Sequence, residues 1–311
     1  MSEGNNWEKD VITSIATEGL KEQKRTRRWG IFFKTLTFLY LFVVLAMLSP
    51  GWQGSSSKSK KHTALVDLKG VISQESEASA DNVVTGLRAA FKDPDTAGVI
   101  LRVNSPGGSP VQSGYIYDEI LRLREKHPDT PLYAVISDIC ASGGYYVASA
   151  AEKIYADQAS IVGSIGVRMD NFGFVEAMKK LGIERRTLTA GKNKALLDPF
   201  GPEDPGVIKH MKGLLENVHS QFINAVKQGR GDRLKEVDGM FEGLIWTGDQ
   251  SVEIGLIDEL GSSSYVAREV IGEENIVKFT VEPDFLERFS NKIGAQVSSL
   301  LVEKELLPQL R

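Results

Sequence analysis

Strand-like and helix-like stretches alternate along the chain from Thr63 onward, and this alternation restricts the fold more than any other feature. Apolar runs such as TALVDLKGVI, AGVILRVN, PLYAVIS and IVGSIGV are separated by segments with apolar residues three or four positions apart, such as DNVVTGLRAAFKD and GYIYDEILRLREKH. Such alternation is typical of βαβ units that build a largely parallel sheet. We therefore predict an α/β fold, with a longer helix over residues 203–229, where the helical spacing continues.

A second feature is the apolar stretch 31–48, which is interrupted only by Lys34 and two threonines. A helix of this length approaches the ~30 Å thickness of a bilayer core, so we predict a transmembrane signal-anchor helix over residues 30–49. The alternative is a cleaved secretory signal. About thirty residues precede the apolar stretch, and no A-x-A cleavage pattern follows it, so an uncleaved anchor is favoured.

The residues around this helix predict its orientation. Residues 1–29 are interpreted as a disordered cytoplasmic tail, and the Gly-, Ser- and Lys-rich residues 50–62 as a flexible stalk before a folded domain at 63–311. More basic residues precede the span than follow it, which predicts a cytoplasmic N-terminus and an exported catalytic domain. The span itself is predicted to lie in a bacterial-type inner membrane. The basic residues are Lys21, Lys24, Arg25, Arg27 and Arg28 before the span, and Lys58, Lys60 and Lys61 after it.

Composition makes several classes of function improbable. The net charge of −4 and the isoelectric point near 5.7 do not favour nucleic-acid binding. The single cysteine, Cys140, rules out a disulfide within one chain, and the four scattered histidines do not suggest a zinc site. We expect neither a metal nor a nucleic-acid partner.

Two glycine-rich loops each follow a predicted strand, at residues 103–110 (VNSPGGSP) and 139–147 (ICASGGYYV). Loops at the carboxyl ends of strands commonly form binding sites in α/β folds. Ser142 would precede a helix that begins near Gly143, where backbone N–H groups could stabilise an oxyanion beside its hydroxyl. The alternative is that Ser142 only caps this helix, which the local sequence alone favours.

A nucleophilic serine needs a base, and no histidine is well placed for that role. His127 ends a polar helix, His210 and His219 lie on opposite sides of the predicted long helix, and His62 falls in the predicted stalk. The loop 187–204 contains Lys192 and Lys194 before an apolar Ala-Leu-Leu. A desolvated lysine can replace histidine, although an ordinary solvated lysine remains the alternative.

Five stretches, in this order, resemble one family: LRVNSPGGS, DICASGGYYVASAA, IVGSIGV, TAGKNKALLDPF and WTGDQSVEIGLIDELG. The chain resembles the S49 serine peptidases, in particular the short, single-unit signal peptide peptidases, from about Thr63 to Gly261. This resemblance implies a ClpP/crotonase-like fold, a superhelix of repeated βαβ turns, with no metal or other cofactor.

The resemblance also implies site residues. Ser142 would be the nucleophile and Lys194, rather than Lys192, the general base, with Ser164 orienting the lysine. Because a free lysine is charged at neutral pH, this role requires desolvation by substrate or by a subunit contact. Asn193 stands where the family often has Tyr, and ALL replaces the common SAG, which changes the surroundings of the lysine. The oxyanion hole would use backbone N–H groups of Gly143 and of Gly107 or Gly108.

Relatives form rings in which neighbouring protomers can share a site, so the resemblance implies a homo-oligomer such as an octamer. The implied substrates are signal peptides left in the membrane after export. The amphipathic residues 290–310 are expected to form a C-terminal helical extension. Two other functions remain open: a crotonase-like acyl-CoA enzyme, which would use the same glycine loops on a thioester, and a non-catalytic membrane scaffold.

Overall fold

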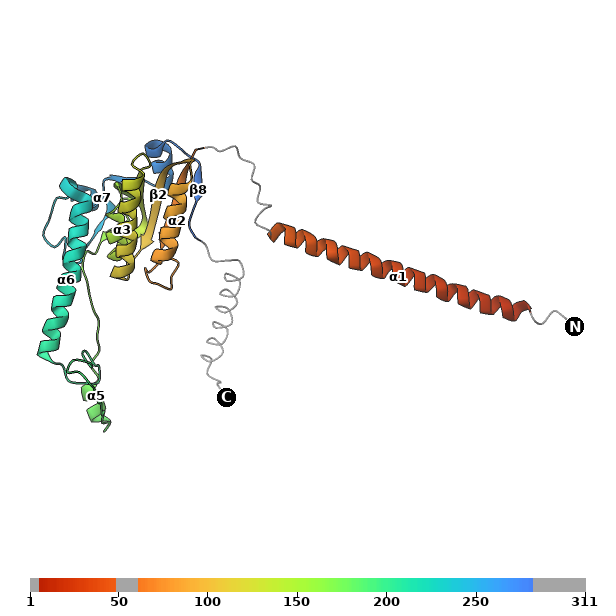
Figure 1. The fold of residues 1–311 in the computed structure, drawn as a ribbon, viewed down its shortest axis with the longest axis horizontal. Helices are drawn as coiled ribbons and strands as arrows, with labels where there is room; N and C mark the ends of the chain where they lie inside the picture. Colours follow the sequence, from red (N-terminus) through yellow and green to blue (C-terminus); the bar gives the residue numbers. More distant parts are fainter. Residues whose placement is uncertain (1–5, 49–60, 282–311) are drawn as a thin grey trace, which may run out of the picture. The chain divides into compact units, whose positions relative to one another are not determined.

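A computed structural model describes residues 6–48 and 61–281, and the chain divides into two units, Met1–Lys60 and Lys61–Arg311. The described part of the first unit is one helix, α1 (Asn6–Leu48), shown in red in Figure 1. Within its stretch Val11–Leu45, an 18-residue window with a mean hydropathy of 1.5 makes this helix long and apolar enough to cross a membrane, as predicted.

Two predictions about the residues before the folded domain differ from the structure. Residues 6–29 continue α1 and are not a disordered tail, because they are rich in the good helix formers Glu, Lys, Gln and Arg. His62 belongs to the first strand and not to the stalk, since its N–H donates to the Asp95 carbonyl at 3.0 Å and its side chain is 6% exposed. The rest of the predicted stalk and the predicted C-terminal extension lie outside the described residues.

An eight-stranded sheet forms the centre of the second unit, in the order β6-β5-β3-β2-β1-β8, with β4 pairing with β3 and β7. Every pair is parallel except β5 with β6, so the predicted α/β class is confirmed. The strands are β1 (His62–Lys69), β2 (Thr96–Ser105), β3 (Leu132–Ala141), β4 (Lys153–Ala156), β5 (Ile161–Gly163), β6 (Ile245–Thr247), β7 (Glu259–Leu260) and β8 (Ile276–Lys278).

Helices α2 (Ala80–Lys92) and α3 (Pro110–Lys126) lie against one face of this sheet (Figure 1). The larger core lies here, and it includes Val66, Leu101 and Ile120. Leu65 and Ile100, the strand neighbours of the first two, point to a smaller core beneath η3 (Val266–Ile271), a short π-helical segment. Both faces of the central strands are therefore buried, as in other parallel sheets, which explains their nearly continuous apolar sequence.

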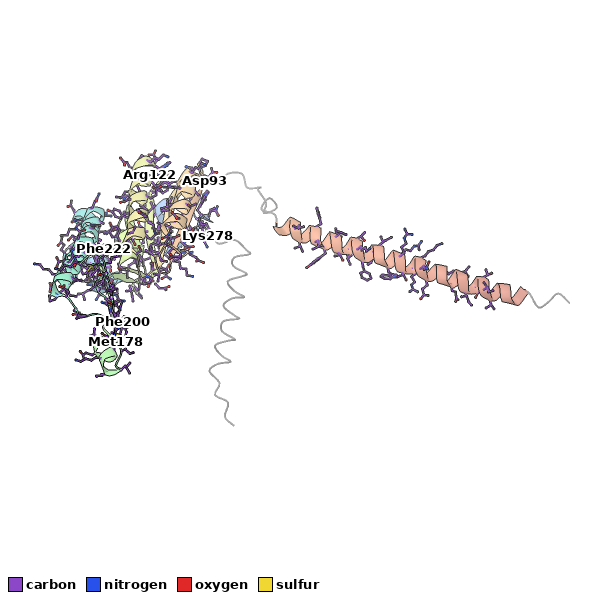
Figure 2. The ribbon with its side chains drawn as sticks, turned by 60° about the horizontal axis from the view of Figure 1, so that its bottom comes forward. Asp93, Arg122, Met178, Phe200, Phe222 and Lys278 are labelled. Carbon is purple, nitrogen blue, oxygen red and sulfur yellow. The ribbon has the colours of Figure 1, made fainter. Side chains whose placement is uncertain are left out.

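The remaining helical elements connect the strands. Helix α4 (Gly143–Ala148) follows β3, and α6 (Pro205–Arg230) confirms the predicted long helix. No residue from 168 to 221 is buried, and Figure 2 shows Met178 and Phe200 of this segment beyond Phe222, where α6 joins the core. We call residues 168–204 the arm; it contains α5 (Val175–Lys180). The others are η2 (Gly231–Arg233), α7 (Gly248–Glu253) and α8 (Ser263–Tyr265).

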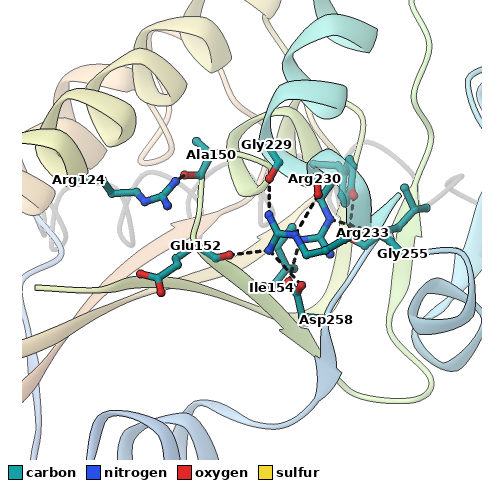
Figure 3. A network of polar contacts seen from close by, with 11 residues as sticks. Arg124, Ala150, Glu152, Ile154, Gly229, Arg230, Arg233, Gly255 and Asp258 are labelled. Carbon is teal, nitrogen blue, oxygen red and sulfur yellow. Dashed lines mark hydrogen bonds and ion pairs between the residues drawn. The ribbon is translucent and has the colours of Figure 1, made fainter. Parts of the chain in front are cut away.

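A buried ionic network joins the C-terminal end of α6 to the sheet (Figure 3). The Arg230 side chain, 1% exposed, donates to the Asp258 carboxylate at 2.7 Å and to the Gly255 carbonyl at 2.8 Å. Arg233 donates to the same carboxylate at 3.1 Å, and the Ile154 N–H of β4 donates to it at 2.7 Å. This network connects the C-terminal end of α6 to β4, and α6 and α4 both line the cavity described next.

Candidate active site

A cavity of about 780 Å³ opens where β2, β3 and β5 end. Its lining includes five of the six residues proposed from the sequence, namely Ser142, Ser164, Gly107, Gly108 and Gly143. These residues come from three separate strand ends, which parallel pairing brings to one edge of the sheet. The sixth residue, Lys194, is not among the lining residues.

Ser142 occupies the single position between the end of β3 and the start of α4. Its backbone has φ 51° and ψ −124°, which is unusual for a non-glycine residue and is typical of functional sites. Ser142 is at the N-cap position of α4, but its side chain makes no capping hydrogen bond to this helix, so a capping role for the hydroxyl is contradicted. The Ser142 N–H donates to the Gly163 carbonyl at 2.8 Å, which fixes the turn, while the side chain lines the cavity.

The loop after β2 packs directly on this turn. A Cβ atom at Gly107 would lie 2.7 Å from the Gly143 nitrogen and 2.8 Å from the Ser142 Cβ, and Gly107 has φ 98°. Both close contact and backbone conformation therefore require glycine. A Cβ at Gly143 would lie 2.5 Å from the Ser113 Oγ and 3.3 Å from the Gly108 nitrogen, so the two glycine loops are in contact beside Ser142.

The hydrogen bonds of this loop distinguish the two candidate donors. The Gly107 N–H already donates to the Ser105 Oγ at 3.1 Å. By contrast, neither the Gly108 nor the Gly143 N–H donates to any residue in the described part of the chain. Gly108 and Gly143, rather than Gly107, therefore have the N–H groups available to a ligand in the cavity.

Ser164 lies next to Ser142 because β3 and β5 are paired. Ala141 and Gly163 are register partners, and each is followed by one of the two serines. Adjacent strands are about 4.8 Å apart, so the two serines are neighbours at the sheet edge. Ser164 also has φ 51°, and its N–H donates to the Leu244 carbonyl at 2.7 Å.

One wall of the cavity is apolar. Tyr146, one turn of α4 after Ser142, packs against Phe222 of α6 with ring centroids 5.1 Å apart, and burial raises the pKa of Tyr146. Val218 and Val167 add to this wall, and Arg168 and Glu242 also line the cavity. No histidine lines the cavity, and residues 6–48 and 61–281 contain no cluster of His, Cys, Asp or Glu that could hold a metal ion.

Lys194 lies elsewhere, on the arm. Its N–H donates to the Gly191 carbonyl at 3.1 Å within a series of turns, and its side chain, like that of Lys192, is exposed. The structure of one chain therefore brings the two serines and the glycines together but leaves Lys194 outside the cavity.

Sequence reasoning did not single out several residues of this site. Ser105 and Ser113 are fully buried serines in contact with the glycine loops, and Tyr146 and Phe222 form the apolar wall. Ser105 precedes Pro-Gly-Gly directly, and Tyr146 follows Ser142 at helical spacing, so both had a local signal. Phe222 had none, because it is 80 residues away from Ser142 in the chain.

Comparison with known proteins indicates the family of this chain. Residues 124–276, which include Ser142, Ser164 and Lys194, match the sequence model of peptidase family S49. "Protease 4" of Haemophilus influenzae is 31% identical over 243 residues, which cover 76% of this chain and 39% of that protein. "Serine protease SPPA, chloroplastic" of Arabidopsis thaliana is 30% identical over 202 residues, covering 63% of this chain and 29% of that protein.

A third relative has a different name. The "Na(+)/H(+) antiporter NhaA" of Brucella abortus is 44% identical over 188 residues, which cover 60% of this chain. The chain spans only 25% of that protein's length, so the name describes a protein that is mostly unmatched here. The family model and the two proteases agree with each other. The chain is a member of peptidase family S49.

Proposed function

We propose that this chain is a membrane-anchored serine endopeptidase in which Ser142 attacks the peptide carbonyl and Lys194 is the general base. The observation that carries the proposal is the conformation of Ser142. Ser142 has φ 51°, and its hydroxyl makes no capping hydrogen bond and lies beside the Gly108 and Gly143 N–H groups. Acyl transfer requires such an arrangement, and a helix cap does not.

The chemistry proceeds in two halves. Neutral Lys194 accepts the Ser142 proton as the Ser142 Oγ bonds to the peptide carbonyl carbon, and the two N–H groups stabilise the oxyanion. Collapse breaks the C–N bond, and the lysine donates its proton to the leaving amine. Water then attacks the ester carbonyl as Lys194 accepts its proton, the ester C–O bond breaks, and the lysine returns the proton to the Ser142 Oγ as the acid is released. In this proposal Ser164, the neighbour of Ser142, accepts or donates a hydrogen bond that orients the lysine amine.

Lys194 is proposed to reach the cavity from a neighbouring protomer of a homo-oligomeric ring, such as an octamer. Support comes from the arm, which exposes apolar side chains that one chain leaves uncovered: Met169 (51%), Phe172 (72%), Leu181 (73%) and Leu188 (99%). Exposed apolar surface of this extent is typical of interfaces. Burial against a second copy would also remove water from the lysine, which favours its neutral form.

Complementation between two inactive variants tests this arrangement. Ser142→Ala and Lys194→Ala should each abolish cleavage of a fluorogenic peptide, while Lys192→Ala, an exposed lysine in the same turns, should remain active. Co-expression of the two inactive variants should restore activity, because about one interface in four would pair an intact serine with an intact lysine. No recovery in mixed oligomers would contradict the shared site, and an active Ser142→Ala variant would contradict the nucleophile.

We also propose that α1 anchors the domain at the outer face of a bacterial-type inner membrane, with the N-terminus of α1 in the cytoplasm. At the outer face, the domain would degrade cleaved signal peptides. The apolar stretch of α1 and the apolar wall of the cavity support this. Trypsin added to spheroplasts should digest residues 61–281 but not an N-terminal epitope tag. Protection of the domain would contradict this orientation, and accumulation of signal peptides only in cells with Ser142→Ala would support the substrate class.

A further inference from the structure

One buried hydroxyl, that of Ser105, connects the last residue of β2 to two neighbouring loops. Its side chain is 0% exposed. The Oγ donates to the Gly70 carbonyl, at the end of β1, at 2.6 Å and accepts the Gly107 N–H at 3.1 Å. Neither partner is the other's sequence neighbour, so this single group sets the position of the glycine loop relative to the sheet.

The next peptide unit of the loop is held from the other side. The Ile72 N–H donates to the Gly107 carbonyl at 2.9 Å, and the Ser109 N–H donates to the Ile72 carbonyl at 2.8 Å. The described part of the chain has no cis peptide bond, so the Gly107 C=O and the Gly108 N–H point in opposite directions. Because the carbonyl points toward Ile72, the Gly108 N–H points away from Ile72, and Gly108 lines the cavity.

Glycine by itself would not hold this orientation. Gly107 has φ 98° and Gly108 has φ 153°, and a residue without a Cβ atom passes easily between such conformations. Two hydrogen bonds restrain Gly107, one at its N–H through Ser105 and one at its carbonyl through Ile72. Removal of the Ser105 hydroxyl would leave the Gly107 N–H without its acceptor. The Pro106–Gly107 peptide unit could then rotate, and the Gly108 N–H that follows would lose its fixed direction.

We propose that Ser105 is a positioning residue that aims the Gly108 N–H at the oxyanion, acting through Gly107 without touching substrate. This inference rests on the proposed function. It predicts that Ser105 contributes to the transition state and not to ground-state binding, because its hydroxyl hydrogen-bonds backbone groups of the loops and Ser105 is not among the residues that line the cavity.

Two inhibitors of one peptide sequence separate this role from a structural one. In a peptide aldehyde, the Ser142 Oγ bonds to the aldehyde carbon, the C=O π bond breaks, and the new oxyanion takes the place of the tetrahedral intermediate, while the serine proton passes to the base. The peptide alcohol obtained by reduction of that aldehyde binds the same cavity without forming an oxyanion. The ratio of the two inhibition constants therefore measures the oxyanion hole.

In the full chain, Ser105→Ala should lower kcat about 10- to 100-fold with little change in KM, and reduce the aldehyde-to-alcohol preference by a similar factor. The matched control is Ser251→Ala. Ser251 is also fully buried, and its Oγ donates to one carbonyl, that of Thr247, at 2.7 Å, but it does not line the cavity. This control should leave the ratio unchanged even if it lowers the melting temperature.

An unchanged ratio in Ser105→Ala, or an equal loss in Ser251→Ala, would overturn the proposal. If Ser105→Ala is recovered unfolded, Ser105→Cys fills the site with a slightly larger side chain of the same branching, whose thiol is a weak hydrogen-bonding group, and it should show the same change. Failure of the proposed function gives a different result. The unaltered protein would then show no preference for the aldehyde, and Ser142→Ala would bind each inhibitor as tightly as the unaltered protein does.

Discussion

Substitution of Asp258 by Asn tests the buried network that holds α6 beside the sheet (Figure 3). The Asn side chain has the same shape, and its oxygen can still accept the Ile154 N–H that now donates to the carboxylate at 2.7 Å. What disappears is the negative charge facing Arg230, whose side chain is 1% exposed. An NH₂ group would also face Arg233, so two donors would oppose each other.

The expected loss of stability follows from this burial. Removal of one partner from a buried ion pair leaves an uncompensated charge and costs about 3–5 kcal/mol. Arg233 contributes little to this loss, because its side chain is 40% exposed and solvent screens its charge. We expect Asp258→Asn to lower the free energy of unfolding by about 3 kcal/mol, which corresponds to a urea midpoint lower by about 1 M for a domain of this size.

The assay is urea unfolding of the full chain in detergent, followed by tryptophan fluorescence, for the single variants and for Arg230→Met/Asp258→Asn. The double variant should be more stable than Asp258→Asn alone, because it leaves no unpaired buried charge. A midpoint shift below about 0.3 M for Asp258→Asn, or double-variant losses that simply add, would refute the reasoning.

The pH dependence of the same variant gives a second measurement. Burial alone would raise the pKa of Asp258, but the hydrogen bond and charge of Arg230 outweigh it and hold the pKa below 3.8. The carboxylate therefore contributes its full stability above about pH 4, and this contribution is lost as the pH falls through the lowered pKa. The difference between wild type and Asp258→Asn should be constant from pH 7 to pH 5 and shrink only below about pH 4.

Three further predictions concern packing and the site. Glu119→Gln should lower the free energy of unfolding by about 1–2 kcal/mol at pH 7, because hydrogen bonds from Arg122 and Arg88 lower the pKa of Glu119 to about 2. The loss should diminish below about pH 4, and a loss that grows in acid would contradict this ionic role. Within α6, Gly213→Ala should raise the melting temperature, since no atom lies within 4 Å of the added Cβ, whereas Gly229→Ala should lower it, since that Cβ would lie 1.9 Å from the Ser149 carbonyl oxygen; thermal melts with the same sign for both would refute this contrast. Gly107→Ala should reduce peptide cleavage at least 100-fold, because its Cβ would lie 2.7 Å from the Gly143 nitrogen, and near-normal activity in a folded variant would show that the two glycine loops need not touch.

Much of the fold could be predicted from local patterns. The long helix was predicted over 203–229 and is observed as Pro205–Arg230, because a helix and its apolar spacing are both properties of neighbouring residues. The N-terminal helix was harder to delimit. Its apolar part was predicted, but residues 6–29 were assigned to a disordered tail, since polar helix formers lack the apolar periodicity on which the prediction relied.

The candidate site was predicted only in part. Ser142 and the glycines carry a signal in the sequence, because Ser-Gly-Gly directly after a predicted strand indicates a tight turn at the strand end. The sequence left open whether Gly107 or Gly108 has the available N–H, and the hydrogen bond from Gly107 to Ser105 distinguishes them. That choice depends on where the end of β2 lies relative to β1, which is a property of the sheet and not of the loop.

The sequence by itself determined the α/β class, the apolar helix and the strand-end loops, because each depends on periodicity or turn chemistry within a dozen residues. Only the tertiary structure decided that Ser142 has a left-handed backbone with a hydroxyl that caps nothing, that Ser164 is its neighbour across the β3–β5 pair, and that Lys194 lies outside the cavity of its own chain. These outcomes depend on strand pairing and on long-range packing, whose contacts join residues far apart in the chain and leave little trace in any short stretch of it.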